Sequence, residues 1–116
     1  MRRQLGLWGE SIAAHFLQGK GYDILERNYY TRYGELDIIC EKDRKLVFVE
    51  VKTRRSTQFG SPEEAVTRQK INHLRKAAMV YLNNWKGPYR EIQFDVITIL
   101  IDAGGQPGIN HIEQAF

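Results

Sequence analysis

The sequence predicts an α/β domain in which a central mixed β-sheet is flanked by helices. Two segments carry apolar residues at helical spacing, and the segments between and after them are rich in alternating or β-branched residues. They follow one another in the order α-β-β-β-α-β-β, which is typical of a mixed sheet covered by helices. With 116 residues, of which 42% are hydrophobic and 27% are charged, the chain is expected to form one folded domain over residues 1–116.

The first helix is expected in the N-terminal part of the chain. Apolar residues from Leu5 to Leu17 recur at i, i+3 or i+4, and i+7 and form one stripe, and Gly19 and Gly21 mark its end. Residues 22–30 are expected to be extended. Residues 31–34 are expected to form the turn that follows.

Residues 34–40 and 45–54 are the strongest predicted strands. The second of them alternates valines with other residues, which indicates a strand with two different faces. The link between the strands is short and polar, and a two-residue turn at Asp43-Arg44 would make them an antiparallel hairpin. That register predicts one apolar face, made by Leu36, Ile38, Cys40, Val47, Val49 and Val51.

The second helix and two further strands are expected after the hairpin. Ser61-Pro62-Glu63-Glu64 is a helix-start signal with a capping box, an apolar stripe runs from Ile71 to Trp85, and Gly87-Pro88 ends it. Residues 92–101 are dense in β-branched residues and predict a strand, so the unit from the hairpin onward predicts a right-handed parallel crossover. Residues 109–116 are expected to add an edge strand.

Two acidic residues face each other in the predicted hairpin. With the turn at Asp43-Arg44, Asp37 lies opposite Glu50, and Glu35 lies opposite Lys52. Directly opposed residues have Cβ atoms about 4.5–5.5 Å apart, and like charges there destabilise a sheet. A divalent cation such as Mg²⁺ would account for the pair, since it prefers carboxylate oxygens, waters and a substrate phosphate.

Lys52 extends this arrangement into a candidate catalytic site. It lies two residues beyond Glu50 and therefore on the same face of the strand. An ammonium group there can hold or deprotonate an attacking water and balance charge in a phosphoryl-transfer transition state. The alternative is that Asp37, Glu50 and Lys52 form an ion-pair ladder on the surface. Asp95 either reaches the same site or has an edge-strand or capping role.

The hairpin also resembles the hallmark segments of a known group of nucleases. Gly34-Glu35-Leu36-Asp37-Ile38-Ile39 and Val47-Phe48-Val49-Glu50-Val51-Lys52-Thr53-Arg54 resemble the Asp…Glu-x-Lys signature of restriction-endonuclease-like enzymes. Nearly the whole chain is similar to the YraN family, small uncharacterised bacterial proteins that resemble Holliday junction resolvases and are predicted nucleases. Further segments that carry the resemblance are Gly9-Glu10, Gly60-x-Pro62, Ala65-Val66, Lys70, Tyr81-Leu82 and Phe94-Asp95-Val96.

The resemblance implies both a fold and a chemistry. The fold is a restriction-endonuclease-like core of αβββαβ order, and the activity is metal-dependent endonucleolytic hydrolysis of DNA phosphodiesters, on branched or single-stranded DNA. It implies that Asp37 and Glu50 bind Mg²⁺, for which Mn²⁺ can substitute, that Lys52 is catalytic, and that Glu10 approaches the metal from the first helix. Fold-level analogy is a weaker guide to activity than to fold.

The charge distribution favours a nucleic-acid partner. Residues 52–76 carry a net charge of +5 within a chain whose total is +3, so the remainder is acidic. Such a split is typical of polyanion-binding proteins, although a solvated helix face gives the same pattern. Arg54, Arg55, Gln69 and Lys70 are the candidate DNA contacts, with solvated surface positions as the alternative for each.

Composition limits the remaining possibilities. The single cysteine, Cys40, excludes an intramolecular disulfide and a cysteine-based zinc or iron–sulfur site. The N-terminal residues lack the apolar stretch of a signal peptide, and the longest apolar run, residues 96–101, is too short to span a membrane. We therefore expect a cytoplasmic protein without a membrane partner. A symmetric homodimer is attractive because one small domain covers little of a DNA duplex.

Two other functions are consistent with the sequence. The protein could be a nucleic-acid-binding module, or a recruitment partner in DNA processing, that keeps vestigial catalytic residues. That alternative predicts salt-sensitive DNA binding and no cleavage with any metal. A purely structural assembly factor would bind neither metal nor DNA.

Overall fold

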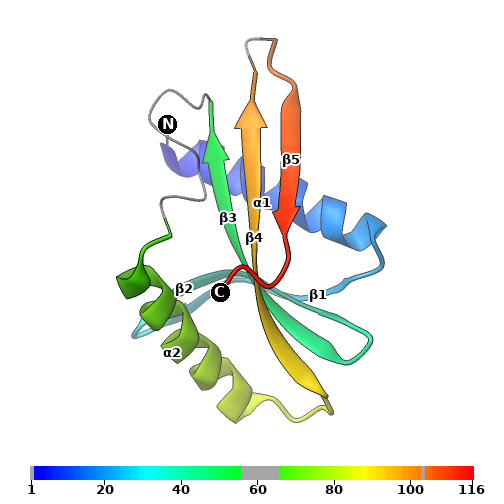
Figure 1. The fold of residues 1–116 in the computed structure, drawn as a ribbon, viewed down its shortest axis with the longest axis vertical. Coiled ribbons are helices and arrows are strands. Elements are labelled where there is room, and N and C mark those ends of the chain that lie inside the picture. The colour runs from blue at the N-terminus through cyan, green and yellow to red at the C-terminus, as the bar shows by residue number, and fades with distance from the viewer. Residues whose placement is uncertain (1, 56–65, 103) are drawn as a thin grey trace.

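The structure is a computed structural model that describes residues 2–55, 66–102 and 104–116 (Figure 1). Two helices and five strands make up these ranges, in the predicted order. They are α1 (Arg2–Gly19), β1 (Asp23–Thr31), β2 (Gly34–Lys42), β3 (Lys45–Arg54), α2 (Arg68–Asn84), β4 (Glu91–Ile101) and β5 (Pro107–Ile112). Neither helix is long and apolar enough to cross a membrane within the residues described.

The strands form one mixed sheet in the order β1-β2-β3-β4-β5. Neighbouring strands are antiparallel except β3 and β4, which are parallel and are connected through α2. This arrangement confirms the predicted α/β class and the parallel crossover. It is compatible with a restriction-endonuclease-like core.

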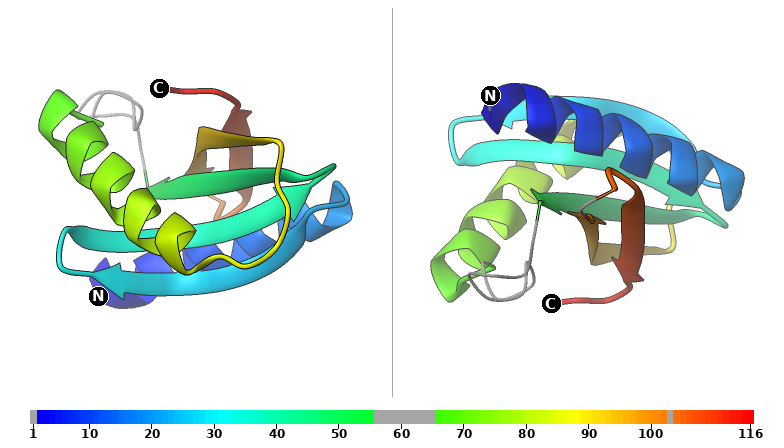
Figure 2. Two further views of the ribbon diagram at one scale, coloured as in Figure 1. Left: turned by 90° about the horizontal axis from the view of Figure 1, so that it is seen from below. Right: turned by 90° about the horizontal axis from the view of Figure 1, so that it is seen from above.

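One helix packs on each face of the sheet (Figure 2). On the α1 face, small residues of the helix lie against aliphatic side chains of the central strands. On the α2 face, aromatic rings dominate, and the Phe48 and Phe94 rings stack 5.4 Å apart. The α1 core includes Ala13, Leu17, Ile38, Cys40, Val49, Ile97 and Ile99, and the α2 core includes Leu36, Ile39, Phe48, Leu74, Ala78, Tyr81 and Phe94.

The β2–β3 hairpin has the predicted turn and register. Asp43 and Arg44 have φ angles of 51° and 62°, as both central residues of a type I′ turn require. Ile38 pairs with Val49 and Cys40 with Val47, as expected.

The predicted apolar face of the hairpin is wrong at Leu36. Leu36 packs in the α2 core, whereas Ile38 and Cys40 pack in the α1 core. β1 changes in the same place, because Arg27 bonds to α1 through Ser11 whereas Tyr29 packs on the α2 side. Asn28, between them, has a left-handed φ of 52°, which breaks the strict alternation of side chains in this ribbon.

Two predicted boundaries also need correction. The helix-start signal at residues 61–64 lies outside the described residues, and α2 begins at Arg68 with Thr67 as its N-cap. Val66 and Thr67 are not helical, so α2 does not run unbroken from that signal.

The last strand is shorter than the predicted 109–116. β5 ends at Ile112, and Gln114 has a left-handed φ of 51° that turns the chain away from the strand. The backbone N–H of Ala115 then donates to the carbonyl of Phe94, and Phe116 stacks on the Phe94 ring. The final residues therefore cover the α2 core instead of extending the sheet.

Candidate metal centre

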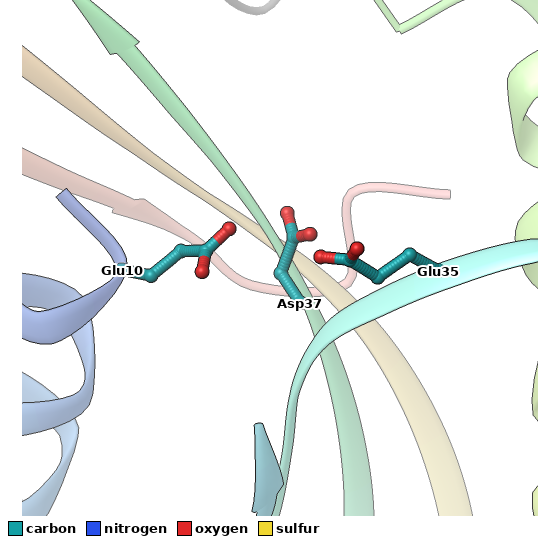
Figure 3. Close-up of side chains that lie close together, drawn as sticks. All are labelled: Glu10, Glu35 and Asp37. Carbon is teal, nitrogen blue, oxygen red and sulfur yellow. The ribbon is translucent and has the colours of Figure 1, made fainter. Parts of the chain in front are cut away.

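Carboxylates from three elements converge beside the hairpin. Glu10 comes from α1, Glu35 and Asp37 from β2, and Glu50 from β3. One oxygen of each of Glu10, Glu35 and Asp37 lies within 4.8 Å of the other two, and Figure 3 shows Asp37 between the two glutamates. The Asp37 and Glu50 side chains are hydrogen-bonded to each other. We call these four residues the carboxylate cluster.

Asp37 and Glu50 meet through their side chains and not as backbone partners. The β2–β3 ladder ends at Ile38 and Val49, and beyond that point β2 remains paired only with β1. As β2 turns away, the Asp37 carboxylate occupies the space beside β3 and accepts a 2.9 Å hydrogen bond from the backbone N–H of Val51.

The predicted pairing of Glu35 with Lys52 is wrong for the same reason. Glu35 pairs with Tyr30 of β1, because β2 has already left β3 at this level. Its side chain instead accepts a hydrogen bond from Asn28, also in β1. Divergence of two paired strands thus removes one expected contact and brings Glu35 into the carboxylate cluster.

Burial and neighbouring charge favour a proton on the Asp37–Glu50 pair. Burial raises the pKa of Asp37 well above its ordinary value, and the hydrogen bond and negative charge of Glu50 raise it further. The hydrogen bond from Val51 opposes this shift in pKa only partly. Without a cation, the pair is therefore expected to share a proton near neutral pH.

Glu50 supplies the one polar side-chain atom of the cluster that is both deeply buried and unsatisfied among the described residues. The residue is 6% exposed, and its Oε2 atom has no hydrogen-bond partner. Lys70 Nζ lies 3.4 Å from that oxygen, but without the geometry of a hydrogen bond. Leaving a buried carboxylate oxygen unpaired is costly, so this atom is suited to an additional ligand.

Close packing of α1 brings Glu10 to the cluster. A Cβ at the preceding residue, Gly9, would overlap the side-chain hydroxyl of Thr53 in β3. Glycine therefore allows the helix backbone to approach β3 closely enough for Glu10 to reach Asp37. Burial raises the pKa of Glu10, a hydrogen bond from Asn28 opposes that shift, and the charge of Glu35 adds to it.

The predicted basic and polar residues surround the cluster at different depths. Lys52 is half-buried in β3, two residues beyond Glu50, and Lys70 reaches Glu50 from α2. Arg54 and Arg55 are exposed at the end of β3, and Gln69 is exposed in the first turn of α2.

A narrow cleft adjoins the cluster between the β1–β2 turn and α2. Its volume is about 90 Å³. Glu35 and Lys70 line it, so the cleft presents both an acid of the cluster and a basic group. Arg32 and Lys76 lie over the ring of Tyr33, at 4.8 and 5.7 Å from its centre. The other lining residues are Gly34, His73, Leu74 and Ala77.

Comparison with known proteins places this chain in a family. Residues 9–99 match the model described as "Uncharacterised protein family UPF0102". The chain belongs to the UPF0102 family. A UPF0102 protein of Syntrophomonas wolfei is 62% identical over 116 residues and all of both chains. Others are those of Nocardia farcinica, 44% identical over 99% of this chain and 91% of the relative, and Rhodococcus jostii, 45% identical over 97% and 95%.

The UPF0102 match confirms the predicted YraN relationship. The matched range begins at Gly9 and so includes the helical glycine and Glu10. It also contains the whole hairpin and α2, and hence the full carboxylate cluster. The names of the UPF0102 relatives print no activity, so the chemistry must be argued from the site.

A second buried acid of the UPF0102 chain lies outside the cluster. Asp95 is fully buried on the α1 face of β4 and accepts hydrogen bonds from Gln93 Nε2 at 3.0 Å and from the backbone N–H of Gln114 at 3.1 Å. Its other oxygen lies 2.7 Å from His111 Nε2. Of the two predictions made for Asp95, the structure supports the structural role.

Sequence reasoning missed Asn28 altogether. Its side-chain nitrogen donates to Glu10 Oε1 at 2.7 Å and to Glu35 Oε1 at 2.9 Å. An asparagine inside a predicted strand carries little signal on its own. The only available hint is that asparagine tolerates a left-handed backbone better than most residues.

Proposed function

We propose that the protein is a divalent-cation-dependent nuclease that hydrolyses phosphodiester bonds of DNA. The observation that carries the proposal is the buried, unpartnered Oε2 of Glu50 in a cluster of carboxylates drawn from three elements. Structural packing gives no reason to gather four acids in this way. A cation would satisfy the unpaired oxygen and relieve the repulsion at once.

The donor set fits Mg²⁺, with Mn²⁺ as a substitute. All four side chains offer carboxylate oxygens, which hard divalent cations prefer. Asp37, Glu50 and Glu10 would hold the ion, as the resemblance implies, with Glu35 beside them. When bound, the cation supplies Lewis acidity toward the phosphate and lowers the pKa of water.

The remaining steps belong to side chains of the protein. Lys52 follows Glu50 on β3, where its ammonium group can orient or deprotonate the attacking water and balance the charge on the phosphate. Arg54, Arg55 and Gln69 are exposed around the site and can contact neighbouring phosphates. Lys70, which lines the cleft beside Glu35, can bind a phosphate next to the scissile one.

Cleavage assays with purified protein test this proposal. Linear duplex, single-stranded and branched DNA are incubated with Mg²⁺ or Mn²⁺, and branched or single-stranded DNA is the expected substrate. Asp37→Asn and Glu50→Gln are expected to reduce cleavage by more than about 100-fold, since loss of groups that merely support ligands costs about 10–100-fold. Glu26→Gln, at an exposed position of β1, is the matched control and should leave cleavage unchanged.

Equal cleavage by the wild type and both site variants would overturn the proposal. The alternative is a binding module without catalysis, and the basic groups near the cleft favour it as the second candidate. It predicts DNA binding that weakens steeply with salt, with no cleavage in any arm of the assay.

A further inference from the structure

Asn28 joins two acids of the cluster that come from different elements. Its amide nitrogen uses both of its hydrogens, one toward Oε1 of Glu10 on α1 and one toward Oε1 of Glu35 on β2. Each glutamate keeps its Oε2 free of these bonds. The amide therefore fixes one oxygen of each acid and leaves the other for a further ligand.

The backbone holds Asn28 in this position. It lies between Arg27 and Tyr29, whose β2 partners are Ile38 and Leu36, so it stands opposite Asp37. Its φ of 52° lies in the left-handed region, which asparagine adopts more readily than most residues. The preceding residue, Arg27, donates to Ser11 Oγ at 3.0 Å, which ties β1 to α1 one residue after Glu10.

An amide suits this location better than a charged donor. Glu10 and Glu35 repel each other, and two N–H groups offset that repulsion without bringing in a positive charge. A lysine or arginine here would neutralise the acids but also repel a cation. Asparagine therefore preserves the negative charge that attracts a cation and orients the acids at the same time.

We infer that Asn28 is a positioning residue of the metal centre, which holds Glu10 and Glu35 as a ligand pair and makes Glu35 a working member of it. This inference rests on the proposed function, because it concerns the same cation. Glu35 lies outside the set implied by family resemblance, which consists of Asp37, Glu50 and Glu10. Asn28 itself bonds to the acids and is not assigned any contact with the substrate.

Calorimetric titration of Mn²⁺ into metal-free protein tests the inference without any cleavage assay. Asn28→Gly removes the amide but accepts the left-handed backbone, and it is expected to weaken Mn²⁺ binding by about 10–100-fold. Glu35→Gln, which removes a charge without removing the acceptor oxygen, is expected to weaken binding by about 10-fold or more. Asn110→Gly, at an exposed position of β5, is the matched control and should bind as the wild type does.

The double variant separates positioning from general destabilisation. If Asn28 acts through Glu35, the effects of Asn28→Gly and Glu35→Gln on Mn²⁺ affinity will be less than additive. A purely structural role would lower the melting temperature of Asn28→Gly and leave the Mn²⁺ affinity unchanged, and that result would overturn the inference. Glu35→Gln keeps it testable if Asn28→Gly does not fold, because unchanged Mn²⁺ affinity in that variant would also overturn it.

Failure of the inference and failure of the proposed function give different results. If the wild type binds Mn²⁺, Glu50→Gln abolishes binding and Asn28→Gly binds normally, the proposed metal centre stands and the role of Asn28 is wrong. If the wild type does not bind Mn²⁺, the proposed function is overturned, and the inference with it.

Discussion

Two buried acids of this protein, Asp95 and Glu50, are satisfied in opposite ways. Asp95 receives hydrogen bonds from Gln93 and from the backbone of Gln114, and its second oxygen contacts His111. Glu50 shares a proton with Asp37 and leaves Oε2 without a hydrogen bond. Burial of a carboxylate is therefore no sign of function by itself. An incomplete set of partners is the feature that distinguishes the carboxylate cluster.

The largest effect on stability is expected at Asp95. Asp95→Ala removes an acceptor of two hydrogen bonds and leaves His111 without its buried partner, which should lower the free energy of unfolding by about 3–5 kcal/mol. Urea unfolding measures this change. Mn²⁺ affinity of the folded variant should equal that of the wild type, and a loss of metal binding would mean that the two regions are not independent.

A smaller effect of opposite sign is expected at Asp37 in metal-free protein. The pKa of Asp37 is raised on folding, so its contribution to stability is fully present below its unfolded value near 3.8 and is lost as pH rises toward the folded value. Asp37→Asn stays neutral and can donate to Glu50, so its stability should fall less with pH. At about pH 8 the variant should be more stable than the wild type by about 1–3 kcal/mol.

Thermal melts between about pH 4 and pH 8 measure this difference. The gain should vanish at the acid end of the range, and saturating Mn²⁺ should stabilise the wild type more than the variant. A variant that is less stable than the wild type at every pH would indicate that the acids of the cluster are satisfied as well as Asp95 is.

The smallest effect is expected at Lys70. Its side chain is 42% exposed and approaches Glu50 without a hydrogen bond, so the ion pair contributes little. Lys70→Met should change the free energy of unfolding by less than about 1 kcal/mol, with Lys76→Met on the exposed side of α2 as the control. A loss above about 2 kcal/mol would show that Lys70 does satisfy the Glu50 oxygen, and the contrast with Asp95 would fail.

Much of the fold follows from local patterns. The Asp43-Arg44 turn, the pairing of Ile38 with Val49 and the limits of β3 all agree with the sequence-based predictions. These features depend on alternation and turn geometry, which act over a few residues. The α2 start could not be derived in the same way, because the stronger capping signal at residues 61–64 outweighed Thr67 in the sequence.

The candidate site was predicted only in its chain-local part. Spacing alone placed Glu50 and Lys52 together, and the hairpin register brought Asp37 near them. It could not show that β2 leaves β3 after Ile38, because this depends on the left-handed turn of Asn28 in a third strand. That divergence replaced the expected Glu35–Lys52 pair with the Asn28 bonds to Glu35 and Glu10.

By itself, the sequence determined the α/β class, the hairpin and the acids from which a metal centre could be built. Those properties arise from residue types at fixed short spacings, which the chain carries whether folded or not. Only the tertiary structure decided which acids meet, because Gly9 lets α1 approach β3 and Asn28 bridges α1 and β2. It also decided that Asp95 is satisfied and Glu50 is not, since hydrogen-bond partners distant in sequence become neighbours only when the sheet and helices pack.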